Sequence, residues 1–334
     1  MGCQPTITIA IPTRNRSGLL VDAIDSALAQ TFTDTEILVL DDDSSDDTCE
    51  VVARYADPRL RYVRHHPNIG MAANWNYGYE HGRGRYVAVL HDDDYWAPTF
   101  LDRVLTVFQR QPDAGFVYAA VVPVDLDRRI IGDRRLALSD VDLIMPPATA
   151  VERLVKATEV GWPAILVRRA AMLEIGGFTE DFPYHKDWAA WIRLAARYPV
   201  GFVAETLGYY RIHPGQFSAE YAAELSAIAS DRHRMLRSTI PDLPLPPAER
   251  ARLLKLALRA LAETQLVSAW ELARNGDRKR ARTEARYAFS IDRGVAWRTP
   301  QLVAAAYAAS FLPRGMIRSL DHWRAQARPL FRRS

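Results

Sequence analysis

Cysteine is scarce in this sequence of 334 residues, which has only Cys3 and Cys49. A framework of disulfide bonds is therefore not expected, and the cysteine content is typical of a protein from a reducing compartment. The sequence also lacks an apolar run of about 20 residues that could cross a bilayer. Its N-terminus has none of the basic and apolar regions of a signal peptide. We therefore expect a cytoplasmic protein.

A strong excess of one charge is also missing. The chain has 43 basic residues and 40 acidic ones, which gives a net charge of +3. Because a dedicated nucleic-acid binder usually carries a concentrated basic face, we expect no nucleic-acid partner. Hydrophobic residues make up 49% of the chain and charged residues 25%, as in globular proteins. The length suits one large domain, or one domain with a helical appendage.

A glycine-rich phosphate-binding loop is the third absence. Residues 6–11 alternate between apolar and polar side chains and predict a first strand. Pro12, Thr13 and Arg14 follow it, where a dinucleotide-binding or P-loop fold would have closely spaced glycines. Any phosphate at this edge would therefore be bound by other means, such as a metal ion.

Two short apolar runs end in clusters of carboxylates. Residues 86–90 lead into His91 and the aspartates at 92–94, and residues 36–40 lead into the aspartates at 41–43. Adjacent carboxylates repel one another, so a fold that places them together needs a compensating cation. Magnesium and manganese prefer oxygen ligands of this kind. The alternative is a solvated acidic turn.

The order of the predicted elements indicates an α/β fold. Strands are predicted at residues 6–11, 36–40, 60–63, 86–92, 115–122, 163–167 and 200–212, with helices between most of them. This alternation predicts a parallel sheet, and the two acidic clusters would meet at its carboxyl edge, where such sheets bind ligands. Residues 123–147 are polar and predict a long loop or hairpin beside the site.

Beyond about residue 221 the sequence changes character. Alanine, leucine and arginine dominate with helical periodicity, and residues 248–274 and 277–291 predict a helical hairpin. We therefore expect two domains, at residues 1–220 and 221–334.

Six short motifs resemble, in their order and spacing, those of glycosyltransferase family 2. They are Ile-Pro-Thr-Arg-Asn-Arg at 11–16, Asp-Asp-Asp at 41–43, Asn-Ile-Gly at 68–70, His-Asp-Asp-Asp at 91–94, Gly-Gly-Phe at 176–178 and Lys-Asp-Trp at 186–188. The resemblance covers roughly residues 6–218. It implies the GT-A fold, a Rossmann-like and mostly parallel sheet flanked by helices, here with a C-terminal helical extension. It also implies an inverting enzyme with a nucleotide-sugar donor, most often a UDP-sugar.

The resemblance assigns the nucleotide side of the site residue by residue. Pro12, Thr13 and Arg14 match the first loop, which packs against the base. Asp42 matches the carboxylate that accepts the uracil N3 hydrogen, which suits a group that only accepts hydrogen bonds. Asp92 falls on the position that contacts the ribose.

The same resemblance implies a divalent metal, Mn²⁺ or Mg²⁺, that neutralises the leaving diphosphate. Asp93 matches the metal ligand. His213 is expected to be a further ligand or to contact the diphosphate, and Arg211 to contact the diphosphate. His91 replaces the first aspartate of the usual motif, so the full ligand set stays open.

Asp187 matches the general base, which takes the proton of the acceptor hydroxyl as the new bond forms. Asp187 also suits the start of a helix, where a negative charge is favoured, and the two roles are compatible. Trp188 and Trp191 recur at helical spacing. We expect them to lie in the core rather than to stack on sugars.

Two other functions stay open from the residues alone. A non-catalytic scaffold for glycan assembly would be expected to lose at least one of Asp42, Asp93 and Asp187. A metal-dependent nucleotidyltransferase would normally carry a glycine-rich, basic loop after the first strand. Residues 12–18 hold only one glycine and two arginines.

The acceptor is expected to be a glycan or a lipid-linked glycan. Arginines crowd the C-terminal end, together with Ile317, Leu320 and Trp323. Basic side chains opposite an apolar face can lie in an anionic membrane interface. We therefore consider peripheral contact at the inner face of the membrane, and the alternative is a terminal helix packed on the hairpin.

Overall fold

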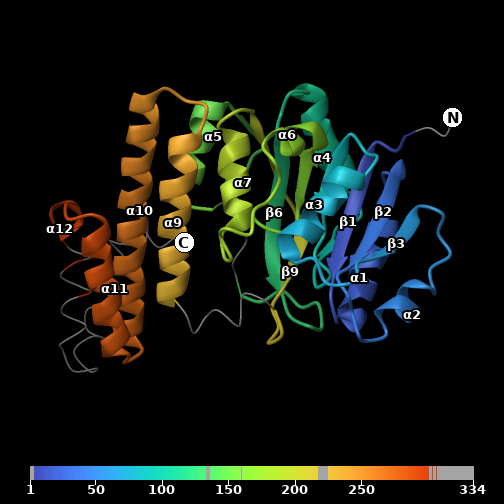
Figure 1. Ribbon diagram of the computed structural model, residues 1–334, viewed down its shortest axis with the longest axis horizontal. Helices are drawn as coiled ribbons and strands as arrows, with labels where there is room; N and C mark the ends of the chain where they lie inside the picture. The colour runs from blue at the N-terminus through green and yellow to red at the C-terminus, as the bar shows by residue number, and fades with distance from the viewer. Residues whose placement is uncertain are drawn as a thin grey trace. The chain divides into compact units, whose positions relative to one another are not determined.

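The computed structural model describes residues 4–132, 136–158, 160–216 and 225–300, together with residues 303 and 306. It contains two compact units. Unit 1 comprises Met1–Leu154 and Thr158–Ala223, and unit 2 comprises Val155–Ala157 and Glu224–Ser334. Unit 1 holds a nine-stranded sheet, whereas the elements described in unit 2 are helical (Figure 1).

The strands of unit 1 are ordered β3-β2-β1-β4-β8-β6-β9-β5, and β7 pairs with β9. They are β1 (Ile7–Thr13), β2 (Thr35–Asp41), β3 (Leu60–Arg64), β4 (Tyr86–Val89), β5 (Tyr95–Trp96), β6 (Phe116–Val124), β7 (Leu143–Met145), β8 (Ile165–Arg168) and β9 (Val200–Arg211). Within the group β1 to β4, each pair of neighbouring strands is parallel. The predicted mostly parallel sheet flanked by helices is thus confirmed.

The second half of the sheet is mixed, which the alternation of elements did not predict. Strand β8 runs antiparallel to β4 and β6, and β5 and β7 run antiparallel to β9. The segment before β8 lies at the carboxyl edge, since Trp162 lines the cavity described below. A strand that starts at this edge must run against β4. Strands β5 and β7 were not predicted, because each has three residues or fewer.

Helices cover both faces of the sheet. Unit 1 contains α1 (Ser17–Leu28), α2 (Thr48–Val52), α3 (Met71–His81), α4 (Phe100–Arg110), α5 (Pro147–Leu154), α6 (Arg169–Glu174) and α7 (Lys186–Ala195). Ile7, Ile9 and Ile11 of β1 belong to one core cluster with the buried side chains of α1 and α4. Ala10 faces the other way, and a Cβ atom on Gly78 of α3 would lie 2.6 Å from the Ala10 Cβ. Burial on both faces explains the nearly continuous apolar runs of the central strands.

Unit 2 consists of α9 (Leu225–Thr239), the short 3₁₀ helix η1 (Ile240–Asp242), α10 (Pro247–Arg274), α11 (Arg278–Ile291) and α12 (Val295–Arg298). Helices α10 and α11 form the predicted hairpin. Gly276 turns the chain with a φ of +92°, and the Asp277 side chain caps α11 by accepting from the Arg280 N–H at 3.0 Å. The basic C-terminal segment of the membrane prediction lies outside the described residues.

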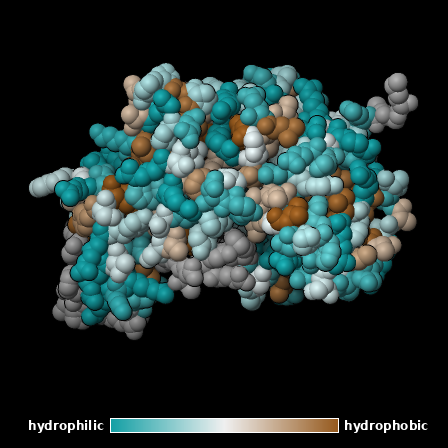
Figure 2. Space-filling view, in the orientation of Figure 1, coloured by the Kyte–Doolittle hydropathy of each residue, from teal (hydrophilic) through white to brown (hydrophobic). Residues whose placement is uncertain are grey.

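Among the helices that the structure describes, none combines the length and apolar character needed to cross a bilayer. The face seen in Figure 2 is largely hydrophilic, with hydrophobic residues in small groups.

Candidate active site

A cavity of about 630 Å³ opens at the carboxyl edge of unit 1. It is lined by the predicted residues Pro12, Thr13, Arg14, Asp42, Asp92, Asp93 and Asp187, and also by Arg16, Trp75, His91 and Trp162. These side chains lie at the carboxyl ends of β1, β2 and β4 or just after them, or come from the segments around α3, β8 and α7. The fold therefore brings the two acidic clusters and Asp187 to one cavity, while Arg211 and His213 do not line it.

Asp42 is held by the turn that precedes α3. Its Oδ1 accepts the Ile69 N–H at 2.7 Å, and its Oδ2 accepts the Gly70 N–H at 3.2 Å and the Asn68 side-chain amide. A carboxylate has about four acceptor positions, so these contacts leave roughly one for a ligand. The motif Asn-Ile-Gly at 68–70 thus positions Asp42.

The neighbours of Asp42 support the same loop. Asp41 accepts the Ser44 N–H at 2.8 Å and the Tyr62 hydroxyl, so it stabilises the turn after β2. Asp43 adopts a φ of +67°, in the left-handed region that glycine and asparagine tolerate best. Its carboxylate lies 2.8 Å from the His66 ring nitrogen Nδ1.

The aspartates at 92–94 are all buried after β4, with exposed fractions of 8% or less. The Arg16 side chain enters this cluster from the residue just before α1. Its Nη1 lies 3.2 Å from Asp92 Oδ1 and 2.8 Å from Asp93 Oδ2. Its Nη2 donates to the Gly215 carbonyl at 2.8 Å. One guanidinium thus ties the acidic cluster to the tight turn after β9.

That turn also places His213. The His213 Nε2 lies 3.2 Å from Asp93 Oδ2, the oxygen that Arg16 contacts. The His213 backbone N–H donates to Gln216 Oε1 at 2.9 Å. His213 therefore reaches the cluster through Asp93 rather than through the cavity wall.

Burial and mutual repulsion set the electrostatics of the cluster. Burial and then the Asp93 carboxylate raise the pKa of Asp92 and of Asp94 well above the usual aspartate range. Burial lowers the pKa of His91, which favours the neutral ring. The cluster is therefore short of positive charge even with Arg16 in place.

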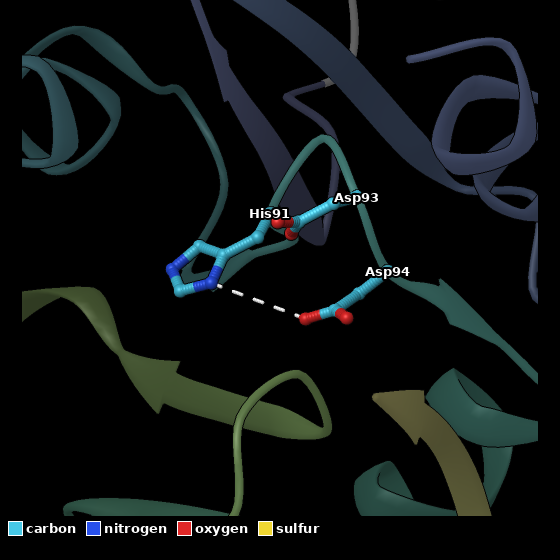
Figure 3. Close-up of side chains that lie close together, drawn as sticks. All are labelled: His91, Asp93 and Asp94. Carbon is cyan, nitrogen blue, oxygen red and sulfur yellow. Dashed lines mark ion pairs between the residues drawn. The ribbon is translucent and has the colours of Figure 1, made fainter. Parts of the chain in front are cut away.

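A divalent cation fits this donor set. His91, Asp93 and Asp94 each offer a ligand atom, and these three atoms lie within 4.8 Å of one another. Figure 3 shows the His91 ring facing the Asp94 carboxylate, with Nδ1 and Oδ2 4.0 Å apart. Asp94 Oδ2 and His91 Nε2 are buried and have no hydrogen-bond partner among the described residues. Buried atoms with a free lone pair and no hydrogen-bond partner, beside a carboxylate, are suited to hold a metal ion.

Arg211 is placed away from the cavity. Its side chain is buried and its guanidinium pairs with Asp22. Its backbone N–H donates to Asp94 Oδ1 at 2.8 Å. This geometry holds Arg211 behind the acidic cluster, where it supports Asp94, and does not bring it to a diphosphate in the cavity.

Asp187 is the second residue of α7 and lines the cavity. Its Oδ2 accepts the indole N–H of Trp162 at 2.7 Å. The preceding Lys186 is buried and pairs with Glu180, at 2.7 Å between Nζ and Oε2. Trp188 and Trp191 lie in the core as predicted, 4% and 0% exposed.

Sequence reasoning missed two residues of this site. Arg16 belongs to the motif at 11–16, but nothing in that motif shows that its side chain spans the carboxylates. Trp162 lies before β8 in a segment without helical or strand periodicity. Its ring stacks on His91, with centroids 4.4 Å apart and an interplanar angle of 22°.

Comparison with known proteins agrees with this geometry. The sequence model described as glycosyl transferase family 2 matches residues 8–135. The chain is 26% identical to the UDP-Glc:alpha-D-GlcNAc-diphosphoundecaprenol beta-1,3-glucosyltransferase WfaP of Escherichia coli. That alignment covers 66% of the chain and 82% of WfaP.

Two solved structures share the fold. S. aureus TarS 1-349 in complex with UDP-GlcNAc aligns with a TM-score of 0.67 and 15% identity, over 96% of this chain and 92% of that one. Mannosyltransferase PcManGT from Pyrobaculum calidifontis, in complex with GDP-Man and Mn²⁺, aligns with a TM-score of 0.58 and 20% identity, over 98% of this chain and 82% of that one. The motifs, the sheet and the family match together show that the chain is a glycosyltransferase with the GT-A fold, whose residues 8–135 match glycosyltransferase family 2.

Proposed function

We propose that the chain is an inverting enzyme that transfers a sugar from a nucleotide diphosphate to a hydroxyl group of a glycan or lipid-linked acceptor. A UDP-sugar is the first donor to test. The observation that carries the proposal is one cavity that holds Asp42, the acidic cluster and Asp187. WfaP is named for a UDP-glucose donor and a diphosphoundecaprenol-linked acceptor, which supports the donor and acceptor classes.

The donor base is proposed to bind beside Asp42. The turn at 68–70 fixes this carboxylate and leaves it roughly one free acceptor position, which suits a single ring N–H of the base. Pro12, Thr13 and Arg14 line the same cavity and are proposed to contact the base, and Asp92, which also lines it, is proposed to contact the ribose.

A divalent metal ion would neutralise the leaving diphosphate. Asp93 is its proposed central ligand, with His91 and Asp94 as further donors. His213 is proposed to bind or orient the same centre through its contact with Asp93 Oδ2. PcManGT, which shares the fold, was solved with Mn²⁺.

Asp187 is the proposed general base. Trp162 occupies its Oδ2, so Oδ1 remains for the proton of the acceptor hydroxyl. A carboxylate that removes this proton makes the acceptor oxygen a better nucleophile. One base and one displacement at the anomeric carbon give inversion.

The test is a panel of nucleotide sugars with Mn²⁺ or Mg²⁺, scored by thermal shift and by donor hydrolysis. One donor should stabilise the protein only with metal, and Asp93→Ala should remove this metal-dependent stabilisation. Asp187→Asn should bind the donor normally and turn over about 10²–10⁴-fold more slowly. Asp181→Asn, on the exposed loop before α7, is the matched control and should behave as wild type.

Two results would overturn the proposal. Normal turnover by Asp187→Asn would exclude its role as base. Metal-dependent donor binding without hydrolysis or transfer, for any donor and acceptor tested, would favour the scaffold.

The membrane proposal concerns the C-terminal segment, which lies outside the described residues. Flotation with anionic liposomes should separate the full chain from one that ends near residue 312. The proposal would be wrong if the full and shortened chains float equally, or if flotation does not depend on salt concentration.

A further inference from the structure

Trp162 contacts both halves of the candidate site. Its indole N–H donates to Asp187 Oδ2 at 2.7 Å, and its ring face stacks on His91. We infer that Trp162 is a positioning residue, which holds the Asp187 carboxylate in the orientation for proton removal and aligns it with the acidic cluster. This inference rests on the proposed role of Asp187 as the base.

The chain fixes Trp162 from both sides. Gly161 lies so close to β6 that a Cβ atom there would be 2.7 Å from Val121 Cγ2. On the other side, the carbonyl of Pro163 accepts the buried Trp96 indole N–H at 3.0 Å. Because both neighbours of Trp162, Gly161 and Pro163, are held by these contacts, the Trp162 side chain can be held as firmly as one on a helix. The indole therefore has a defined direction toward Asp187.

The hydrogen bond determines which oxygen of Asp187 is available. An indole N–H only donates, so it marks Oδ2 as an acceptor and leaves Oδ1 toward the cavity. Without this donor the carboxylate can rotate about its terminal bond. Catalysis by a base depends on its geometry relative to the acceptor hydroxyl, and small losses of alignment slow the reaction.

The ring face of Trp162 serves the other half of the site. The His91 ring packs against two tryptophans that also contact each other: its centroid lies 4.4 Å from that of Trp162 and 5.4 Å from that of Trp75, and the two tryptophan centroids are 5.4 Å apart. Both stacked pairs are close to parallel, at 22° and 23°. These contacts restrain the plane of the His91 ring. The same indole therefore helps to position both the His91 ring and the Asp187 carboxylate.

Trp188 provides a control for Trp162, because its indole N–H has a different hydrogen-bond acceptor. Trp188 donates its indole N–H to the Leu154 carbonyl at 2.7 Å and is buried away from the cavity lining. Trp188→Phe thus also removes a buried indole hydrogen bond, but not one to Asp187. A purely structural role of Trp162 would make the two Phe variants alike in turnover.

The test is a double-mutant cycle with Trp162→Phe and Asp187→Asn, measured in the full chain with its preferred donor and metal. Loss of a hydrogen bond to a charged group predicts a fall in kcat of about ten- to hundredfold for Trp162→Phe. Donor KM and the donor thermal shift should stay near wild type. In the Asp187→Asn background the second change should add little, because the group that Trp162 positions can no longer act as a base.

Benzothienylalanine at position 162 keeps the ring shape and removes only the donor, so it replaces the Phe variant if that variant does not fold. Its kcat should fall equally, while Trp188→Phe keeps a near-normal kcat. If Asp187→Asn is slow but both changes at 162 leave kcat within twofold of wild type, the positioning role is wrong. Additive losses in the cycle would also overturn it. Normal turnover by Asp187→Asn would instead remove the proposed function itself.

Discussion

Arg16 and Asp93 form a contact at the position where a metal ion is proposed to bind, with Arg16 Nη1 2.8 Å from Asp93 Oδ2. The guanidinium also reaches Asp92, and its other end holds the Gly215 carbonyl. A side chain of the protein thus supplies part of the positive charge that the buried aspartates need. Arg16 and a divalent cation would compete for the Asp93 carboxylate.

The first prediction is that Arg16→Gln lowers the melting temperature of the metal-free protein and tightens Mn²⁺ binding. The first effect follows because the carboxylates lose a counter-charge. The second effect follows because a competing cation is removed. We expect the Kd for Mn²⁺ to fall about tenfold, which corresponds to about 1.4 kcal/mol of binding free energy. Calorimetric titration with Mn²⁺ and thermal melts with and without metal measure both.

Arg110→Gln is the matched control for this change, because Arg110 is exposed at the end of α4. It should alter neither quantity. Weaker Mn²⁺ binding by Arg16→Gln would instead show that Arg16 supports the metal centre rather than competing with the ion.

The second prediction concerns Asp42. Asp42→Ala leaves the backbone N–H groups of Ile69 and Gly70 without their acceptor, which costs about 1–3 kcal/mol for each one that stays buried. Donor affinity and stability to urea should therefore fall together. Arg14→Ala, at an exposed residue of the cavity wall, should weaken donor binding alone. An Asp42→Ala protein with unchanged urea stability would contradict the described turn.

The third prediction compares two glycines in helices. Gly78→Ala places a Cβ atom 2.6 Å from that of Ala10, so α3 must move off β1, and overpacking of this kind costs about 1–3 kcal/mol. Gly18 lies in the first turn of α1 with no atom within 4 Å of the added Cβ position. Gly18→Ala should be neutral or stabilising by up to about 1 kcal/mol. Urea unfolding of both variants checks the pair, and equal stabilities would contradict the close approach of α3 to β1.

The fourth prediction concerns acid. Burial by itself would raise the pKa of Glu36, but hydrogen bonds from the Arg83 backbone, the Thr8 hydroxyl and the Arg83 guanidinium outweigh it and lower the pKa below its usual 4.5. A group whose pKa is lowered by folding stabilises the protein above its ordinary pKa. That stability is lost as the pH falls through the folded-state value.

Glu36→Gln should therefore cost about 2 kcal/mol at pH 7 and progressively less below pH 4.5. Urea unfolding of wild type and variant at pH 7 and at several values below 4.5 measures the convergence. A constant difference across this range would show that Glu36 does not titrate with folding.

Much of the fold was predictable from local patterns. The apolar runs of β1, β2 and β4 identified buried strands, and the aspartates at the ends of β2 and β4 predicted the binding edge. Trp188 and Trp191 were placed in the core by their helical spacing. These features depend on short stretches of sequence, where side-chain periodicity reports burial directly.

The remainder depends on contacts between distant residues. Arg16 meets Asp93 across 77 residues, and Trp162 meets Asp187 from a loop without periodicity. Arg211 was expected to face a diphosphate, but its partner Asp22 holds it behind the cluster. A sequence motif gives the residue type at such positions, whereas only the packed structure gives the direction of the side chain.

The insertion of β8 between β4 and β6 limits how this protein can be divided. The family match ends at residue 135, yet β8 and β9 complete the sheet from the sequence that follows it. A chain cut near this point would expose unpaired edges on both β4 and β6, which favour aggregation. Residues 8–135 alone are therefore not expected to fold when they are moved into another protein. Chimeras that exchange acceptor specificity must exchange strands of the shared sheet, and they should fold only when β8 and its two neighbours come from compatible parents.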